Sequence, residues 1–87
     1  MKAWARLGDA GTHGGAIVSS AVNTRCEGEL VARVGDMYAC PTHGLNAITG
    51  PGSTRYRIEG QMLARHGDAT ACGATIIASA TRTFDDD

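Results

Sequence analysis

The segments EGELVARVGDMYAC (27–40) and EGQMLARHGDATAC (59–72) are two copies of one pattern. Both contain Glu-Gly, then Ala-Arg, then Gly-Asp, then Ala-Cys, at identical spacing. A pattern that recurs in this way indicates a repeat architecture, in which each copy is one supersecondary unit that packs against its neighbours. The repeat therefore determines the fold, and we compare the rest of the chain with it.

A third copy is divided between the two ends of the chain. MKAWARLGDAGTH (1–13) matches the second half of the pattern, with a histidine in the place of the cysteine. ATIIASATRTFDD (74–86) matches the segments that follow the other two copies, and it stops where they continue into Ala-Arg. The sequence thus predicts one domain over residues 1–87, with its third repeat split between 74–87 and 1–13. A closed threefold arrangement would make the two chain ends neighbours.

Local signals favour strands over helices. Alternating apolar and polar residues, β-branched side chains and frequent glycine turns are typical of short strands joined by hairpins. The Glu-Gly pairs at 27–28 and 59–60 suit the positive-φ positions of hairpin turns. No segment combines a sustained helical period with capping residues. We expect an all-β fold of short strands and hairpins with threefold pseudosymmetry.

The composition limits the classes of protein to consider. A chain of 87 residues with one Trp, two Tyr and one Phe has a thin core, and such domains usually need a disulfide or a metal. Three cysteines cannot complete a disulfide framework within one chain. A net charge of −1 without a basic stripe argues against nucleic-acid binding, and no segment is apolar enough for a stable membrane anchor. The N-terminus has no signal-peptide core, so we expect synthesis in the cytoplasm.

One position of the repeat carries a metal-ligand residue three times. His13, Cys40 and Cys72 each lie four residues after the aspartate of Gly-Asp, and equivalent positions around a threefold axis converge on one point. Tetrahedral zinc needs a fourth ligand, for which His43 in CPTH is the candidate. Two thiolates would balance the charge of Zn²⁺, and four protein ligands favour a structural role. The sequence predicts one zinc at this point of convergence.

Other polar residues have non-catalytic explanations. Asp9, Asp36 and Asp68 each follow a turn glycine, where aspartate commonly caps backbone N–H groups. His66 occupies a position that is apolar in the other copies, which favours a packing or surface role. It stays open as an alternative fourth metal ligand.

The third cysteine, Cys26, aligns with Ile58 and Phe84 and is predicted to be a small core residue. In the same alignment, residues 85–87 correspond to the turn at 27–29. The chain shows no Ser-His-Asp arrangement, no phosphate-binding loop and no carboxylate pair with a role, so we expect no enzymatic activity.

In combination, ARLGD…THGG, ARVGD…CPTHG and ARHGD…CGA resemble the PAAR-repeat proteins over essentially the whole chain. The resemblance implies a small β-rich cone that binds zinc near its tip and caps the trimeric VgrG-type spike of a bacterial type VI secretion system. One tip would bind each spike trimer, aid puncture of the target envelope and link effector proteins to the spike. The tip would be delivered with the spike outside the cell or into a target cell.

The resemblance leaves two departures and two rival hypotheses. Family sites often carry three histidines and one cysteine, whereas the matching positions here supply His13, Cys40, His43 and Cys72. Many relatives carry a toxin domain after the repeats, whereas this chain ends at FDDD, so we expect a bare tip. A thiol redox protein that uses Cys40 and Cys72 is one rival, which titratable thiols without zinc would favour. A free-standing zinc-binding module is the other, which a stable monomer without affinity for a spike would favour.

Overall fold

The computed structural model describes residues 2–85, and every regular element within this range is a strand. The expected all-β fold is confirmed. No membrane-spanning helix occurs between residues 2 and 85. Within residues 2–85, most strands have two residues, and only β6 (Met37–Cys40) and β7 (Gly44–Gly50) are longer.

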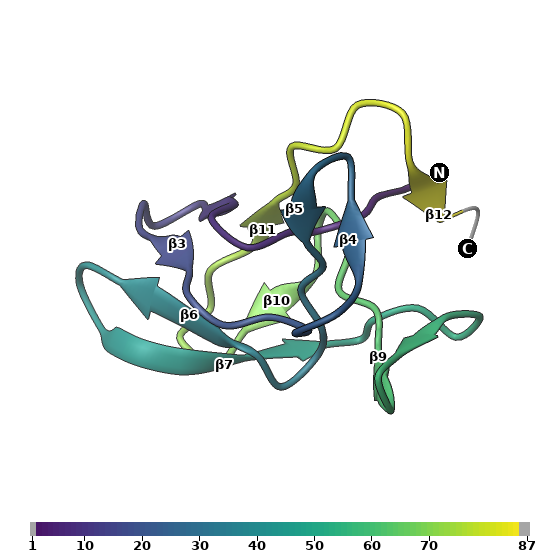
Figure 1. Cartoon of the computed structure of the whole chain (residues 1–87). Coiled ribbons are helices and arrows are strands. Elements are labelled where there is room, and N and C mark those ends of the chain that lie inside the picture. Colours follow the sequence, from purple (N-terminus) through teal and green to yellow (C-terminus); the bar gives the residue numbers. More distant parts are fainter. Residues whose placement is uncertain (1, 86–87) are drawn as a thin grey trace.

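The strands form one larger sheet and four separate pairs, all antiparallel (Figure 1). The larger sheet has the order β10-β7-β6-β3, and β6 and β7 are joined by the tight turn of residues 41–43. Its outer members are β10 (Ala69–Thr70) and β3 (Ala16–Ile17). The pairs are β1 (Lys2–Ala3) with β12 (Phe84–Asp85), β2 (Ala10–Gly11) with β11 (Ile76–Ile77), β4 (Arg25–Cys26) with β5 (Glu29–Leu30), and β8 (Arg57–Ile58) with β9 (Gln61–Met62).

A closed ring of backbone hydrogen bonds joins the three Ala-Arg segments at the centre of the molecule. The N–H of Ala5 donates to the carbonyl of Ala64 (3.0 Å), that of Ala64 to Ala32 (3.1 Å), and that of Ala32 back to Ala5 (3.0 Å). All three alanines are fully buried, and larger side chains there would force the backbones apart. The repeats therefore contact one another through equivalent residues. Threefold pseudosymmetry of the whole cone stays a prediction.

Each of the three Gly-Asp turns is closed by a hydrogen bond to its aspartate side chain. Asp9, Asp36 and Asp68 are buried, and each accepts a hydrogen bond of 2.8 Å from the backbone N–H three residues before it. The predicted capping role of these aspartates is confirmed. A buried carboxylate that accepts backbone hydrogen bonds leaves fewer polar groups unsatisfied, which suits a structural role.

The buried apolar side chains form two clusters, one beneath the predicted metal ligands and one among the three strand pairs β1–β12, β4–β5 and β8–β9. We call the region of these three pairs the hairpin end. The first cluster contains Ala5, Ile17, Ala32, Tyr38, Cys40, Ile48, Ala64, Ala74 and Ile76, and the second contains Ala21, Cys26, Val31, Ile58, Leu63 and Ala80.

The first and last described strands lie side by side, as the split repeat predicts. Lys2 pairs with Asp85, whereas in the equivalent hairpin the partner of Glu29 is Cys26. The residue equivalent to Cys26 is therefore Asp85. The sequence alignment, which placed Phe84 there, was wrong by one residue.

The physical reason for the error is charge neutralisation. Asp85 is fully buried because a guanidinium nitrogen of Arg65 lies 3.3 Å from its Oδ2, while Phe84 points outward with 41 % of its surface exposed. A pattern of hydrophobicity selects the phenylalanine and misses a buried ion pair. The prediction that residues 85–87 match the turn at 27–29 is therefore also wrong for Asp85, which matches Cys26 and not Glu27. Residues 86 and 87 lie outside the described part of the chain.

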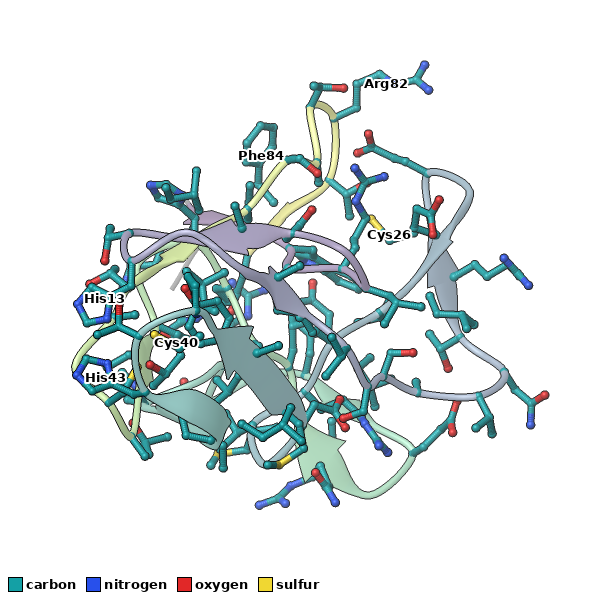
Figure 2. The ribbon with its side chains drawn as sticks, turned by 90° about the vertical axis from the view of Figure 1, so that its left-hand side faces the viewer. His13, Cys26, Cys40, His43, Arg82 and Phe84 are labelled. Atoms are coloured by element: carbon teal, nitrogen blue, oxygen red, sulfur yellow. The ribbon has the colours of Figure 1, made fainter. Side chains whose placement is uncertain are left out.

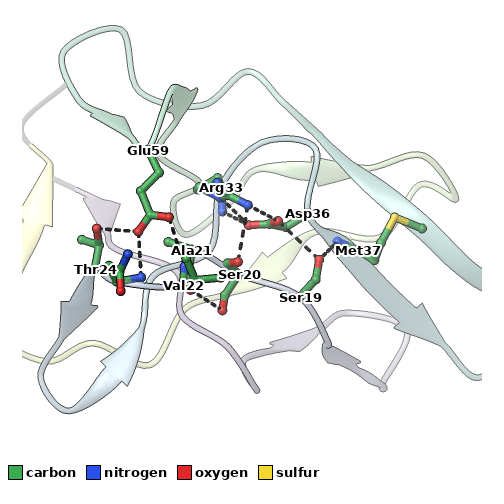
Figure 3. Close-up of polar contacts among 10 residues, drawn as sticks. Ser19, Ser20, Ala21, Val22, Thr24, Arg33, Asp36, Met37 and Glu59 are labelled. Carbon is green, nitrogen blue, oxygen red and sulfur yellow. Dashed lines mark hydrogen bonds and ion pairs between the residues drawn. The ribbon is translucent and has the colours of Figure 1, made fainter.

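Carboxylates at the hairpin turns bind the loops of neighbouring repeats. Glu59, in the turn between β8 and β9, accepts hydrogen bonds from the backbone N–H groups of Val22 (3.1 Å) and Asn23 (2.9 Å). It also accepts one from the hydroxyl of Thr24 (3.0 Å), as Figure 3 shows. These bonds lower the pKa of Glu59, chiefly through the N–H of Asn23.

Glu27, in the turn between β4 and β5, makes the equivalent contacts with the last loop of the chain. Its carboxylate accepts from the backbone N–H groups of Thr81 (3.0 Å) and Arg82 (2.9 Å). The N–H of Thr81, followed by that of Arg82, lowers the pKa of Glu27 to about 2. Glu27 and Glu59 both have positive φ (50° and 53°), which a non-glycine residue adopts at a cost, and the paired hydrogen bonds offset that cost.

Candidate metal centre

Four side chains from three turns meet at one end of the molecule. Figure 2 labels three of them, His13, Cys40 and His43, on the side away from Cys26 of the hairpin end. His13 lies in the turn between β2 and β3, Cys40 ends β6, His43 lies in the β6–β7 turn, and Cys72 follows β10. Their ligand atoms all lie within 4.8 Å of one another. The structure therefore brings together the four residues that the sequence predicts, and we call this region the metal end.

The distances between donor atoms fit a tetrahedral centre. The Sγ of Cys40 lies 3.7 Å from Nδ1 of His13 and 3.4 Å from Nδ1 of His43, and the Sγ of Cys72 lies 3.7 Å from Nδ1 of His13. Sulfur and nitrogen ligands of tetrahedral zinc, at about 2.3 Å and 2.0 Å from the metal, are about 3.5 Å apart. Two sulfurs and two imidazole nitrogens also suit a soft or borderline ion better than Ca²⁺ or Mg²⁺. The cluster could bind a metal ion.

Glycines allow the His13 turn to approach strand β6 closely. A Cβ atom on Gly11 would lie 2.5 Å from the hydroxyl oxygen of Tyr38, and one on Gly15 would overlap the carbonyl oxygen of Ala39. Gly15 also has a φ of +71°, which residues with a side chain rarely adopt. The glycines around His13 are therefore needed to place its ring beside Cys40.

The protonation state of Cys72 favours metal binding. The hydroxyl of Thr70, 3.2 Å from its Sγ, is the main cause that lowers the pKa of the Cys72 thiol from 9.0 to about 6, helped by the backbone N–H of Ala74. The thiolate is the form that ligates metals. A pKa of about 6 therefore favours the metal-binding thiolate of Cys72 at neutral pH.

The other two candidates lie elsewhere. His66 is exposed, and its Nδ1 accepts a hydrogen bond of 3.1 Å from the N–H of Ala78, which agrees with the predicted surface role. Cys26 is buried in the hairpin-end cluster, remote from the labelled ligands in Figure 2, as predicted for a core residue.

Sequence reasoning missed three residues that contact the ligands or their turns. The hydroxyl of Tyr38 donates to the carbonyl of Gly14, the hydroxyl of Thr70 lies against Cys72, and Oδ1 of Asn46 accepts from the N–H of Cys72 (3.2 Å). Tyr38 and Thr70 share one repeat position, two residues before a ligand, and that shared position was the available signal.

The fold and site define a small all-β repeat domain with a Cys₂His₂ cluster, and comparison with protein families specifies it further. A family model described as the PAAR motif matches residues 7–78. The chain belongs to the PAAR-motif family, whose members are structural proteins associated with the tip of the type VI secretion spike. Comparison with curated proteins gives no match.

Proposed function

We propose that this protein is a structural tip that caps the trimeric VgrG-type spike of a bacterial type VI secretion system, with one chain on each trimer. Membership of the PAAR-motif family supports the association with a spike tip. The observation that carries the finer proposal is the closed backbone ring of Ala5, Ala32 and Ala64, which joins three equivalent arms of one chain. Three such arms can each meet one subunit of a trimer.

In this proposal, zinc is the metal, and His13, Cys40, His43 and Cys72 bind it. The bound ion would join the three turns of the metal end, where a thin domain has little core of its own. All four tetrahedral positions would be filled by protein atoms, so the ion would have no open position for a catalytic water. The role that follows is structural and not enzymatic.

The hairpin end is the surface that we assign to the spike. Its short strand pairs offer backbone edges to another β structure. Val22, in the loop held by Glu59, is 75 % exposed there, whereas Leu45, beside the β6–β7 turn, is 65 % exposed at the metal end. The protein would be made in the cytoplasm, assembled on the spike and delivered with it outside the cell or into a target cell. Effector proteins attached to the spike would travel with it.

The mass of a purified complex with the spike protein encoded in the same genome tests this proposal. We expect one tip per three spike chains. Val22→Glu should weaken binding about tenfold or more, because a charge would be buried at the interface, whereas Leu45→Glu should leave it unchanged. Three tips per trimer, the opposite pattern in the two variants, or no complex at micromolar concentration would contradict the capping role. The last result would favour a free-standing metal-binding module.

A further inference from the structure

One repeat position beneath the metal end is occupied by three chemically different residues. Gly11, Tyr38 and Thr70 each lie two residues after the aspartate of Gly-Asp and two before a predicted ligand. All three are buried, with Tyr38 at 0 % and Thr70 at 3 % exposure. We call these three residues the layer beneath the ligands; Tyr38 belongs to the first apolar cluster, and each of the three has a different role.

Tyr38 holds the turn that carries His13. Its hydroxyl donates a hydrogen bond to the carbonyl of Gly14, the residue after the ligand. Its ring occupies the space beside Gly11, where a Cβ atom would lie 2.5 Å from the phenol oxygen. The turn itself is closed by a 3.0 Å bond from the N–H of Gly14 to the carbonyl of Gly11. Tyr38 thus contacts both ends of the turn and fixes it from below.

Thr70 holds the thiol of Cys72. Its Oγ1 lies 3.2 Å from the Sγ of Cys72 and 3.4 Å from the carbonyl oxygen of Ala74. The 3.2 Å contact places the hydroxyl directly against Sγ, so the position of Thr70 orients the sulfur, while Asn46 holds the backbone N–H of the same cysteine.

We infer that Tyr38 and Thr70 are positioning residues that set the metal affinity of the centre, although neither is a ligand. This inference rests on the metal centre of the proposed function. Groups that hydrogen-bond to metal ligands or orient them typically change metal affinity by about 10- to 100-fold. Gly11 completes the layer by leaving room for the Tyr38 ring.

The first test removes the hydroxyl of Thr70 at nearly constant shape. The dissociation constants of the full chain for Zn²⁺ and Co²⁺ are measured by competition with a chelating dye, together with the sulfur-to-cobalt absorption of the Co²⁺ form. Thr70→Val should raise both constants about tenfold or more and shift the absorption, and Thr70→Ser should restore both to within about threefold of the unchanged protein. The matched control is Thr49→Val, since the hydroxyl of Thr49 donates to the carbonyl of Ala69 (3.1 Å) and contacts no ligand.

The second test removes the hydroxyl of Tyr38. Tyr38→Phe should also raise the constants about tenfold or more, whereas Tyr56→Phe, whose ring packs on Trp4 at the hairpin end, should not. If Tyr38→Phe fails to fold, the Thr70 variants remain decisive. Variants that unfold at lower temperature but keep the original constants and cobalt absorption would show that the layer only packs, and would overturn the inference. An unchanged protein that binds neither ion would contradict the proposed metal centre itself.

Discussion

The three repeats are held together differently at the two ends of the molecule. At the hairpin end, neighbours bind one another directly: Glu27 and Glu59 each accept backbone hydrogen bonds from the loop of another repeat. Arg65 adds an ion pair to Asp85 in the last strand. At the metal end, three turns bring two thiols and two imidazoles together. Hydrogen bonds and an ion pair within the chain hold the hairpin end together, whereas the metal end carries a cluster that could bind a metal ion.

The distribution of charge explains why the two ends differ. The segments 10–24, 37–54 and 69–81, which include the three turns of the metal end, contain no Lys, Arg, Asp or Glu. The charged side chains that pair repeats are confined to the remaining segments, including the hairpins. Without carboxylates to bridge them, the turns at the metal end contact one another through backbone hydrogen bonds, uncharged side chains and the sulfur and nitrogen donors of the four predicted ligands. The strongest test of the comparison is therefore to remove one of those donors.

The largest effect is expected from His43→Ala. The variant should lose its metal and its cooperative unfolding transition, because metal binding in small zinc domains contributes about 10–16 kcal/mol, as much as the whole stability of many domains. Elemental analysis and thermal unfolding by circular dichroism measure both. The matched histidine variant is His66→Ala, which should retain one ion per chain. Retention of metal in His43→Ala together with its loss in His66→Ala would reassign the fourth ligand.

A smaller but substantial effect is expected from Asp85→Asn at the hairpin end. The change leaves Arg65, which is 4 % exposed, without its partner in the last strand, and Asp68 at 3.8 Å compensates only in part. Breaking a buried ion pair in this way costs about 3 kcal/mol. Urea unfolding at saturating metal should show this loss while the metal content stays at one ion per chain. An unchanged unfolding midpoint would mean that the pair does not hold the two chain ends together.

The features that could be predicted from the sequence are those whose residues lie close together in the chain or recur in each repeat. The offset of four residues identified His13, Cys40 and Cys72, the CPTH turn added His43, and the Gly-Asp pairs identified the backbone caps. Each of these signals lies within a few residues of its structural partner, or is repeated in each copy. Identity of residues at fixed spacing is sufficient for such features.

The features that could not be predicted depend on contacts between distant segments. The carboxylate of Glu27 binds N–H groups 54 and 55 residues away, and any residue with an N–H can supply such a donor. Asp85 is buried beside Arg65, 20 residues away, whose guanidinium neutralises its charge. A hydrophobic pattern treats both acidic residues as exposed, so it gives neither the contact nor the register of the last strand.

A modest effect with a defined pH dependence is expected from Glu27→Gln. Backbone hydrogen bonds, first that of Thr81 and then that of Arg82, lower the pKa of this carboxyl from 4.5 to about 2 in the folded protein. A lowered folded-state pKa stabilises the fold above the unfolded value, and the contribution disappears as the pH falls from about 4.5 to 2. The variant should therefore melt at a lower temperature than the unchanged protein at pH 7, and the gap should narrow below pH 4.5.

Thermal unfolding of the two proteins in identical buffers measures this gap, and release of metal by acid affects both alike. Glu29→Gln, on the same hairpin beyond the turn, is the matched control and should leave the midpoint at pH 7 unchanged. Equal losses in the two variants, or a gap that stays constant below pH 4.5, would show that the bonds to residues 81 and 82 do not stabilise the hairpin end.

The smallest effect is expected from Cys26→Val, and its comparison with Cys40→Val separates burial from chemistry. The two cysteines are almost equally buried, at 5 % and 3 % exposure, but one lies at the hairpin end and the other at the metal end. Valine has nearly the volume of cysteine, so Cys26→Val should change stability by less than about 1 kcal/mol and retain one ion per chain. Cys40→Val preserves the apolar volume just as well, yet it should lose the ion because no thiolate remains to bind it. Elemental analysis and thermal unfolding of both variants give the answer. Loss of metal from Cys26→Val would show that Cys26 contributes to metal binding, and its retention in Cys40→Val would show that Cys40 is not a required ligand.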